Sequence, residues 1–436
     1  MRFDRNQKKL IINGGLWAAY EGFTSAFLAA FALTLGASNT VIGAISAMPF
    51  VALIFSQIPG AKLIEYVSRK KIYVTSTTIS RLLWIFIIIT PYFFKEHPLF
   101  VITFTYFLIR YTEYVTDASW TTTAADITPV KKRGILFGTR NMFLVFGLMA
   151  ASTIGAFYLD LFPKNSPHGF TTIFTMGILI GLLATTQFGK IKIPPYQDHK
   201  HHQLKEFFSR KTLKPYTSII FFFNFAYSLA SPLFVVYILK NLGLSYKIYI
   251  GTIIITSILK MLSNRHWGII TDRYGDKPVA VICMFGTALV PLTYLFVTPN
   301  TLWLIVPAQI ISGIAWAGVD LSAFNLLLDF TNPKRRATEI AQHNMIIAIP
   351  LIISPIFGGI LADNIQHFVI TGIPFVFLVS AILRLISSGL MYRISEPRAK
   401  RKYDLLFVFK RAVAIHPEKF AEHLVNGIVA RVRNRF

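Results

Sequence analysis

The segment Asp126-Ile-Thr-Pro129-Val-Lys-Lys-Arg133 returns 203 residues later as Asp329-Phe-Thr-Asn-Pro333-Lys-Arg-Arg336. The same offset relates residues outside this segment, and an offset of 207 relates a second short pattern earlier in each copy. The further equivalent pairs are Asp117 and Asp320, Asn141 and Asn344, Gly155 and Gly358, and Leu35-Gly36-Ala-Ser38 with Leu242-Gly243-Leu-Ser245. Self-similarity at a nearly constant offset is typical of duplicated structural units. The sequence therefore predicts two similar halves.

The composition is that of a membrane protein. Of the 436 residues, 54% are hydrophobic and 15% are charged, and the mean hydropathy is +0.54. A soluble protein of this size needs far more polar residues to cover its surface. Many apolar stretches are about 20 residues long, the length of a helix that crosses a bilayer. We place spans near 10–34, 40–60, 72–94, 98–124, 138–161, 169–189, 216–239, 248–269, 277–297, 301–328, 338–362 and 368–392.

These spans predict an all-α membrane protein with about 12 transmembrane helices in two pseudo-symmetric six-helix halves. The halves are residues 1–189 and 216–393, and residues 190–215 form a cytoplasmic central loop between them. Residues 394–436 form a tail in which apolar residues recur near helical spacing among lysines and arginines. That pattern is typical of an amphipathic helix attracted to anionic lipid headgroups. Because the tail adjoins a membrane-embedded body, lipid is favoured over nucleic acid as its partner.

The net charge of +24 is distributed unevenly between the loops. Lysine and arginine concentrate in one alternating set of loops, and the opposite set holds little more than Lys95, Lys164, Lys240 and Lys247. Loops rich in lysine and arginine stay on the cytoplasmic side. The pattern predicts a protein of the cell membrane with both termini in the cytoplasm.

Between predicted spans eight and nine stands Gly268-Ile-Ile-Thr-Asp272-Arg273-Tyr-Gly275-Asp-Lys277. It resembles the hallmark loop of the major facilitator superfamily, Gly-x-x-x-Asp-Arg-x-Gly-x-Lys/Arg. The first-half copy at residues 61–70 is degenerate, with Glu65 in place of the aspartate. With the repeat and the twelve spans, the resemblance extends from residue 10 to about residue 392. It implies the fold of that superfamily and a central cavity lined by spans one, four, seven and ten.

The hallmark loop predicts a conformational latch on the cytoplasmic side. Carboxylates at helix ends accept hydrogen bonds from arginine and from neighbouring helix N-termini, and glycine permits close approach. The predicted latch comprises Glu65, Arg69, Gly268, Asp272, Arg273 and Gly275, with Asp126, Arg133, Asp329 and Arg336 as partners. The alternative is that these are ordinary loop charges that set the topology.

Ionisable residues inside the spans are costly in hydrocarbon and therefore indicate function. In span four, Arg110, Glu113 and Asp117 are spaced by three and four residues, which puts them on one stripe of a continuous helix. The predicted cavity and proton-coupling site comprises Glu21, Arg110, Glu113, Asp117, Asn224, Lys260, Trp316 and Asp320. Glu21 and Asp117 are the leading proton carriers, because partial burial brings the pKa of an acid toward neutrality. A static Arg110–Glu113 pair is the alternative for those two residues.

Three cations lie inside other spans. Lys260, in span eight, is predicted to pair with Asp320 or to bind an anionic substrate. Arg384, in span twelve, is predicted to extend toward the cytoplasmic interface, as long cationic side chains near helix ends do. Arg81, in span three, has no assigned role.

These observations favour a secondary transporter that moves a small solute by alternating access, coupled to protons. The alternatives are a translocase of a lipid or lipid-linked substrate with the same fold, and a transport-dead sensor or scaffold. Substrate and direction stay open. No nucleophile–base constellation, phosphate loop or metal motif stands out, so we expect neither an enzyme nor a cofactor. We expect a monomer.

Overall fold

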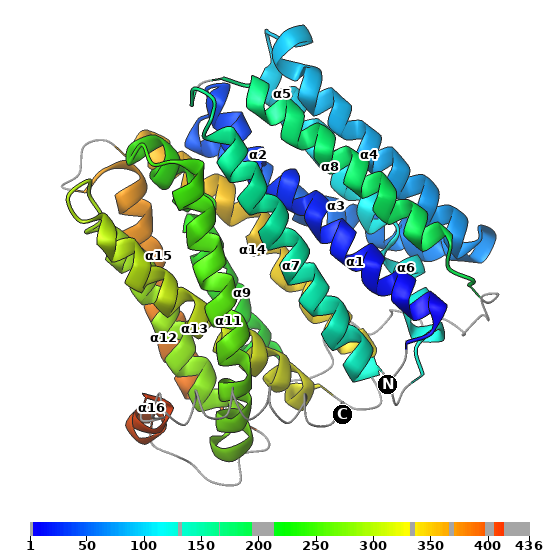
Figure 1. Ribbon diagram of the computed structural model, residues 1–436. Coiled ribbons are helices and arrows are strands. Elements are labelled where there is room, and N and C mark those ends of the chain that lie inside the picture. Colours follow the sequence, from blue (N-terminus) through cyan, green and yellow to red (C-terminus); the bar gives the residue numbers. More distant parts are fainter. Residues whose placement is uncertain are drawn as a thin grey trace, which may run out of the picture.

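The computed structural model describes residues 3–129, 133–164, 166–193, 213–331, 336–365, 370–396 and 405–413. In the first half the helices are α1 (Arg5–Phe23), α2 (Ser25–Thr34), α3 (Asn39–Tyr66), α4 (Arg69–Phe93), α5 (Pro98–Tyr114), α6 (Asp117–Asp126), α7 (Arg133–Leu159) and α8 (His168–Gly189) (Figure 1). In the second half they are α9 (Leu213–Ala230), α10 (Leu233–Val236), η2 (Tyr237–Asn241), α11 (Tyr246–Tyr274), α12 (Asp276–Tyr294), η3 (Leu302–Leu304), α13 (Ile305–Phe330), α14 (Arg336–Asn364) and α15 (Gly372–Arg393). A final helix, α16, covers Leu405–Val413.

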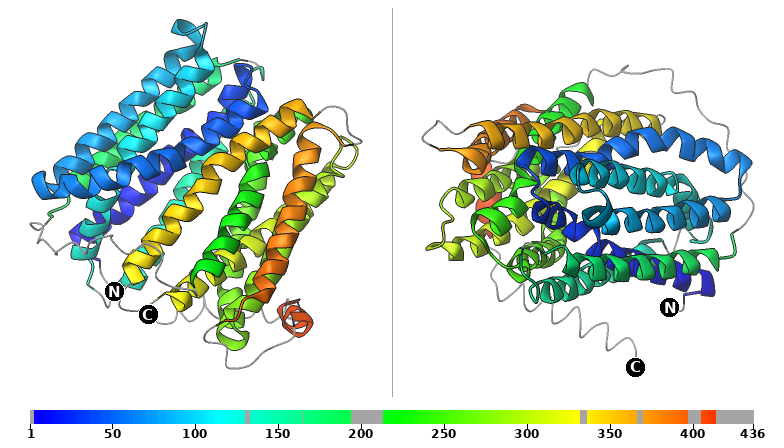
Figure 2. Two further views of the ribbon diagram at one scale, coloured as in Figure 1. Left: turned by 180° about the vertical axis from the view of Figure 1, so that it is seen from behind. Right: turned by 90° about the horizontal axis from the view of Figure 1, so that it is seen from above.

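The helices form two bundles that lie side by side, α1–α8 and α9–α15 (Figures 1 and 2). We call the end of the bundles where α3 ends and α4 begins the basic end, and the opposite end the far end. Within the described ranges, eleven helices are long and apolar enough to cross a membrane. The fourth predicted span is not among them, because it is divided between α5, of 17 residues, and α6, of 10 residues.

The Leu-Gly-x-Ser pattern forms the same turn at the far end of each half. Gly36 has φ +84° and Gly243 has φ +63°, a left-handed conformation that suits glycine. Ser38 then accepts a hydrogen bond from the backbone N–H of Val41, and Ser245 caps α11 in the same way. The repeat predicted from sequence is thus a repeat of chain reversal and helix capping.

The prediction of one continuous helix through span four is wrong. The helix is interrupted at Val115 and Thr116, where the Thr116 N–H donates a hydrogen bond to the carbonyl of Glu113, three residues earlier in the chain. Gly60 of α3 packs directly against the Val115 backbone at this point. Comparable interruptions occur in the first span at Thr24 and in the seventh after Ala230. Asp117 therefore begins a separate helix.

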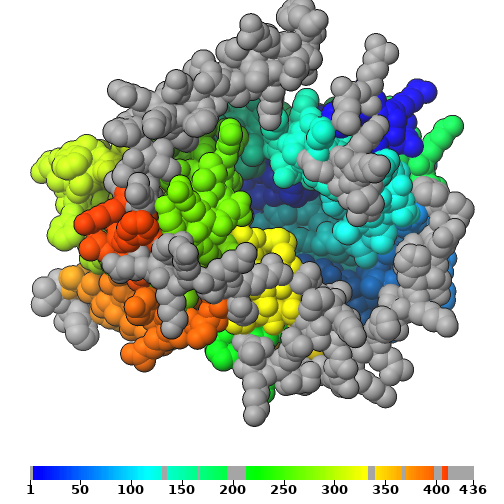
Figure 3. Space-filling model, turned by 90° about the horizontal axis from the view of Figure 1, so that it is seen from below, coloured from blue at the N-terminus to red at the C-terminus, as the bar shows by residue number. Residues whose placement is uncertain are grey.

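Among the described residues, the hydrophobic core that joins the two halves lies at the far end. One hydrophobic core includes Phe27 and Phe174 from the first half and Leu233 and Phe377 from the second. The other cores of the described chain each lie within one half. Viewed from the basic end, a hollow separates the two halves (Figure 3). This conformation is closed at the far end and open at the basic end.

Glycines bring α3 and α14 into backbone contact across the halves. A Cβ added at Gly43 would lie 2.1 Å from the Pro355 carbonyl oxygen, and one at Gly359 would lie 2.4 Å from that of Asn39. Because these neighbours are backbone atoms, they cannot rotate away.

Gly43→Ala is therefore expected to lower stability by about 1–3 kcal/mol through overpacking of this contact. Thermal unfolding of the purified protein in detergent would measure the change. Gly138→Ala is the matched control, because a Cβ at the exposed Gly138 of α7 meets nothing within 4 Å. Equal melting temperatures for the two variants would contradict the expected clash.

The helix α16 lies at the basic end and packs on the second half. Val408 is buried in its core, and Phe407 makes a ring contact with Tyr274 at 5.9 Å. Leu406 and Phe409 are exposed. Binding of this helix to lipid headgroups stays a prediction, and residues 414–436 of the predicted tail lie outside the described chain.

Candidate functional site

Four ionised side chains from three helices meet inside the first half. Arg110 donates from Nη1 to Glu21 Oε1 at 2.9 Å and from Nη2 to Glu21 Oε2 at 2.7 Å. It also donates to Glu113 Oε2 at 2.7 Å. The other oxygen of Glu113 accepts a hydrogen bond from Arg81. We call Glu21, Arg81, Arg110 and Glu113 the four-charge network; its formal charge is zero.

The surroundings of the network explain why the membrane tolerates it. Arg81 lies over the ring of Tyr20 at 3.9 Å, and Arg110 lies over that of Tyr106 at 5.0 Å. Ser25, at the start of α2, accepts from Arg110 at 2.5 Å. Buried charges need this combination of opposite charge and further hydrogen bonds. Glu21 is the most accessible of the four, with a side chain 14% exposed, against 1% for Arg81.

The network corrects two expectations. Asp117 does not join Arg110 and Glu113, because the break before α6 turns it away; its carboxylate lies near Gln57 of α3 and is exposed. Arg81 completes the network although sequence reasoning gave it no role. A charge count would have pointed to it, since Glu21 and Glu113 need two cations and span four supplies one.

In the second half, Lys260 of α11 pairs with Asp320 of α13 at 2.5 Å. Unlike the four-charge network, this pair is accessible, with side chains 40% and 51% exposed. One turn before Asp320, Trp316 packs edge-on against Tyr227 of α9 with ring centroids 4.9 Å apart. Asn224, one turn before Tyr227, is partly exposed, and its side-chain amide has no hydrogen-bond partner among the described residues.

The prediction that Arg384 extends to the interface is wrong. Its side chain is 3% exposed and points into the second half. It donates to the Thr287 carbonyl at 2.8 Å, to the Tyr227 carbonyl at 3.3 Å and to Ser380 at 3.1 Å. Its donors are thus satisfied by backbone and hydroxyl oxygens, and no ion pair with Asp320 forms within the described chain.

At the basic end, the first-half latch partly matches the prediction. Arg69, at the start of α4, donates to Asp126, at the end of α6, at 2.7 Å. The Arg69 side chain is 2% exposed, and its carbonyl accepts from Ser119 at 2.6 Å. This pair ties the two helices together within one half. Glu65, at the end of α3, is exposed, and the side chain of Arg133 lies outside the described part of the chain.

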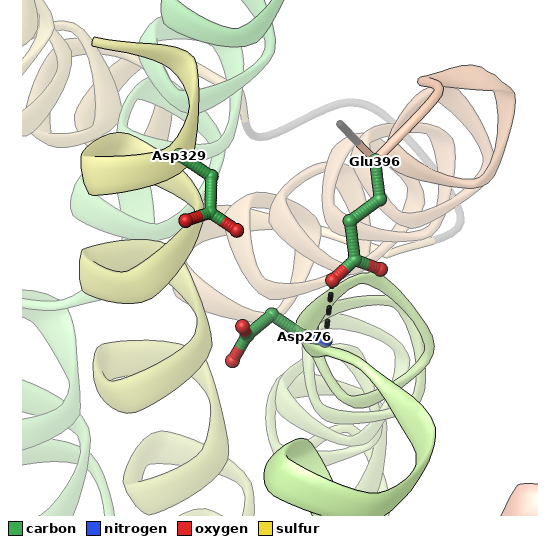
Figure 4. A group of neighbouring side chains, drawn as sticks. All are labelled: Asp276, Asp329 and Glu396. Atoms are coloured by element: carbon green, nitrogen blue, oxygen red, sulfur yellow. Dashed lines mark hydrogen bonds between the residues drawn. The ribbon is translucent and has the colours of Figure 1, made fainter. Parts of the chain in front are cut away.

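In the second half, the contacts at the basic end involve residues that were not predicted as latch residues. Glu396 accepts from the backbone N–H groups of Asp276 at 3.0 Å and Lys277 at 3.2 Å, and so caps the N-terminus of α12 (Figure 4). Gly275, with φ +95°, makes the turn before it. Asp329 faces the same spot from α13 (Figure 4). The predicted partners of Asp329 were Asp272 and Arg273; the acid near it is instead Asp276.

The remaining predicted latch residues are Gly268, Asp272, Arg273 and Arg336. Asp272 and Arg273 lie in the last turn of α11, exposed to solvent. At Gly268 a Cβ would meet nothing within 4 Å, so no close helix approach requires glycine there. The side chain of Arg336 lies outside the described residues. Their roles stay predictions.

A pair of contacts at the far end was missed entirely. Asp363, near the end of α14, accepts from the backbone N–H groups of Asn39 at 3.1 Å and Thr40 at 2.9 Å, the first residues of α3. Its oxygens also accept from the Asn39 amide at 2.8 Å and the Thr40 hydroxyl at 2.6 Å. A carboxylate at a helix N-terminus is favoured by the helix dipole.

The reciprocal contact repeats this geometry. Asp160, just after α7, accepts from the backbone N–H groups of Tyr246 at 2.9 Å and Lys247 at 3.1 Å, the first residues of α11. Asp160 and Asp363 are 203 residues apart, the offset of the internal repeat. Each half therefore caps a helix of the other half. We call Asp160 and Asp363 the far-end caps.

A family model described as Major Facilitator Superfamily matches residues 10–265 and 216–417. The chain is 24% identical over 396 residues to an uncharacterised MFS-type transporter of Methanocaldococcus jannaschii, covering 85% of this chain and 93% of that one. It is 33% identical over 132 residues to the class H tetracycline resistance protein of Pasteurella multocida. That match spans 30% of this chain and 31% of the length of the relative.

Solved structures with a similar fold include the nucleoside transporter NupG, with a TM-score of 0.70 and 15% identity, covering 90% of this chain and 99% of that one. The D-xylose-proton symporter has a TM-score of 0.68 and 13% identity, covering 90% and 98%. A bacterial homologue of the human lysosomal transporter Spinster, inward-facing and occupied, has a TM-score of 0.70 and 12% identity, covering 91% and 98%. At these identities the likeness concerns the fold.

Proposed function

This chain belongs to the major facilitator superfamily of membrane transporters, and from that premise we propose that it moves a small solute by proton-coupled alternating access. We further propose that it works as a monomer in the cell membrane, with the basic end in the cytoplasm. The distribution of lysine and arginine between the loops supports this orientation.

The observation that carries the coupling proposal is the bidentate contact between Glu21 and Arg110. Glu21 is the more accessible carboxylate of a network otherwise sealed inside the first half. Protonation of Glu21 would remove a charge that Arg110 needs, since both oxygens of the carboxylate accept from the guanidinium. Arg110 would then keep Glu113 as its remaining acid.

The positions of the helix breaks connect this proton to a conformational change. Glu21 lies one turn before the interruption at Thr24, and Glu113 lies just before the one at Val115. Half-helices that end in the middle of the membrane can reorient more easily than continuous ones. We propose that loss of the Glu21–Arg110 contact loosens α1 against α5. This would favour the transition between the state that is open at the basic end and the state that is open at the far end. Asp117, at the start of α6, is the second candidate carrier.

Glu21→Gln is expected to abolish proton movement coupled to the solute while leaving a folded protein, because the amide keeps the shape of the side chain without its titratable charge. The assay uses proteoliposomes that contain a pH-sensitive dye and receive a panel of solutes at several pH values. At least one solute should alter the internal pH with the native protein, and the variant should reduce that signal at least tenfold.

Glu96→Gln serves as the control, since Glu96 is an exposed acid in the loop before α5. Solute flux without proton movement, with the flux unchanged in Glu21→Gln, would exclude the coupling proposal. Asp117→Asn in the same assay tests the second carrier.

A further inference from the structure

The two halves handle their intramembrane charges differently. In the first half, Arg110 and Glu113 are each bound to more than one partner and are under 10% exposed. In the second half, Lys260 and Asp320 have each other, and about half of each side chain is accessible. Charges sealed by neighbours suit a fixed or proton-carrying role, whereas an accessible pair is free to exchange partners with a ligand.

Asp320 lies on a face of α13 that contacts both α11 and α9. Asp320 reaches Lys260 of α11 on one side and is within electrostatic range of Tyr227 of α9 on the other. It therefore lies in the wedge between α9 and α11, on the face of α13 that carries Trp316. Asn224 lies one turn from Tyr227, and its side-chain amide has no hydrogen-bond partner in the described part of the chain. These five residues form what we call the second-half corner.

We propose that the second-half corner is a substrate subsite for a zwitterionic aromatic solute, whose ammonium replaces Lys260 at Asp320 while its carboxylate binds Lys260. The proposal rests on the transport function above and names its substrate class. The aromatic group of the solute would pack on Trp316 and Tyr227. The Asn224 amide offers a further hydrogen bond.

Charge balance favours this class over the others. An organic cation that displaced Lys260 would leave the Lys260 ammonium without its counter-ion, and an anion that displaced Asp320 would leave the Asp320 carboxylate without one. A neutral solute would leave the ion pair closed and make no use of it. Binding of a zwitterion replaces the Lys260–Asp320 pair with two ion pairs, one from the solute ammonium to Asp320 and one from the solute carboxylate to Lys260. Each charge therefore keeps a counter-ion. Arg384, the other charge nearby, is satisfied by its carbonyl oxygens.

Four probes that share an indole ring and differ in the charged groups of the side chain test the proposal: L-tryptophan, tryptamine, indole-3-propionate and the neutral indole-3-ethanol. Each is added to the full-length protein in detergent, and the melting temperature is read with a thiol-reactive fluorogenic maleimide. Cys283 is the one cysteine of the chain and is buried, so it reacts on unfolding. Tryptophan should raise the melting temperature at least twice as far as any other probe.

Two variants should change the ranking in opposite directions. Lys260→Met frees Asp320 and should make tryptamine the strongest probe, whereas Asp320→Asn frees Lys260 and should favour indole-3-propionate. A merely structural pair would lower stability without this reversal. If either variant fails to fold, the exchange Lys260→Asp with Asp320→Lys retains the pair and should retain the preference for tryptophan.

A native preference for a singly charged or neutral probe, no response to any of the four, or variants with an unchanged ranking would each overturn the subsite. These outcomes leave the coupling proposal standing, because binding in detergent needs no proton gradient. Conversely, tryptophan binding without proton-coupled flux in liposomes would support the subsite and reject the coupling.

Discussion

Arg110→Met is expected to lower stability by about 3–5 kcal/mol, the usual effect of leaving a buried charge without its partner. Arg110 makes three hydrogen bonds to two carboxylates and a fourth to Ser25. Without it, Glu21 loses both of its contacts to Arg110, while Glu113 keeps Arg81. The four-charge network changes from neutral to a net charge of −1. Proton-coupled transport should be lost as well.

Thermal unfolding in detergent, followed by tryptophan fluorescence, measures this effect, and Trp84 reports on the site because it donates to Tyr20 at 2.6 Å. The matched control is the double variant Arg110→Met with Glu21→Gln, which restores a neutral network. It should recover most of the lost stability, so that the double-mutant cycle gives a large coupling energy. It should not recover proton coupling. If the effects of Arg110→Met and Glu21→Gln simply add in the double variant, the two residues do not depend on each other.

Asp363→Ala is expected to open the far end. The change removes four hydrogen bonds that a single carboxylate accepts from Asn39 and Thr40 across the two halves. Hydrogen bonds to a charged group contribute about 1.5–3 kcal/mol each in favourable settings. Since this end faces solvent, we expect a total near 2 kcal/mol, or about a 30-fold shift in the population of the two states.

Spin labels at Glu96 and Asn300, exposed residues of far-end loops in different halves, measure the opening as a lengthened distance. Labels at Lys71 and Tyr392, at the basic end, should move closer together. Asp160→Ala should also lengthen the distance between the far-end labels, because it removes the cap on Tyr246 and Lys247. The double variant of Asp160 and Asp363 should lengthen it further.

Glu396→Ala is the matched control for the far-end caps. Glu396 also caps a helix N-terminus through two backbone N–H groups, but it follows α15 directly and its donors belong to α12, so the contact does not join the two halves. Its removal should leave the distance between the far-end labels unchanged. A far end that stays closed in the Asp160 and Asp363 double variant would mean that packing alone, such as that at Gly43, holds it shut.

The amino-acid sequence alone determined the architecture of this protein, because the signals involved are local. Apolar length defines the spans, lysine and arginine distribution predicts their orientation, and the internal offset identifies the two halves. The turns at Gly36 and Gly243 also follow from sequence, since the left-handed backbone and the serine cap are properties of adjacent residues. The pairing of Arg110 with Glu113 followed from sequence for a similar reason, because charges in hydrocarbon need a partner, whereas the contact of Arg110 with Glu21 came from the structure.

Tertiary structure alone decided which partners the remaining residues have. Asp117 was expected beside Arg110, but the close approach of Gly60 to Val115 coincides with a break in the helix before it. Arg81 had no assigned role until the fold placed it beside Glu113. Asp160 and Asp363 resemble ordinary acids at helix ends, and the offset of 203 is the one trace they leave in sequence. A helix N-terminus accepts any carboxylate that reaches it, so the packing of the two halves selects the partner.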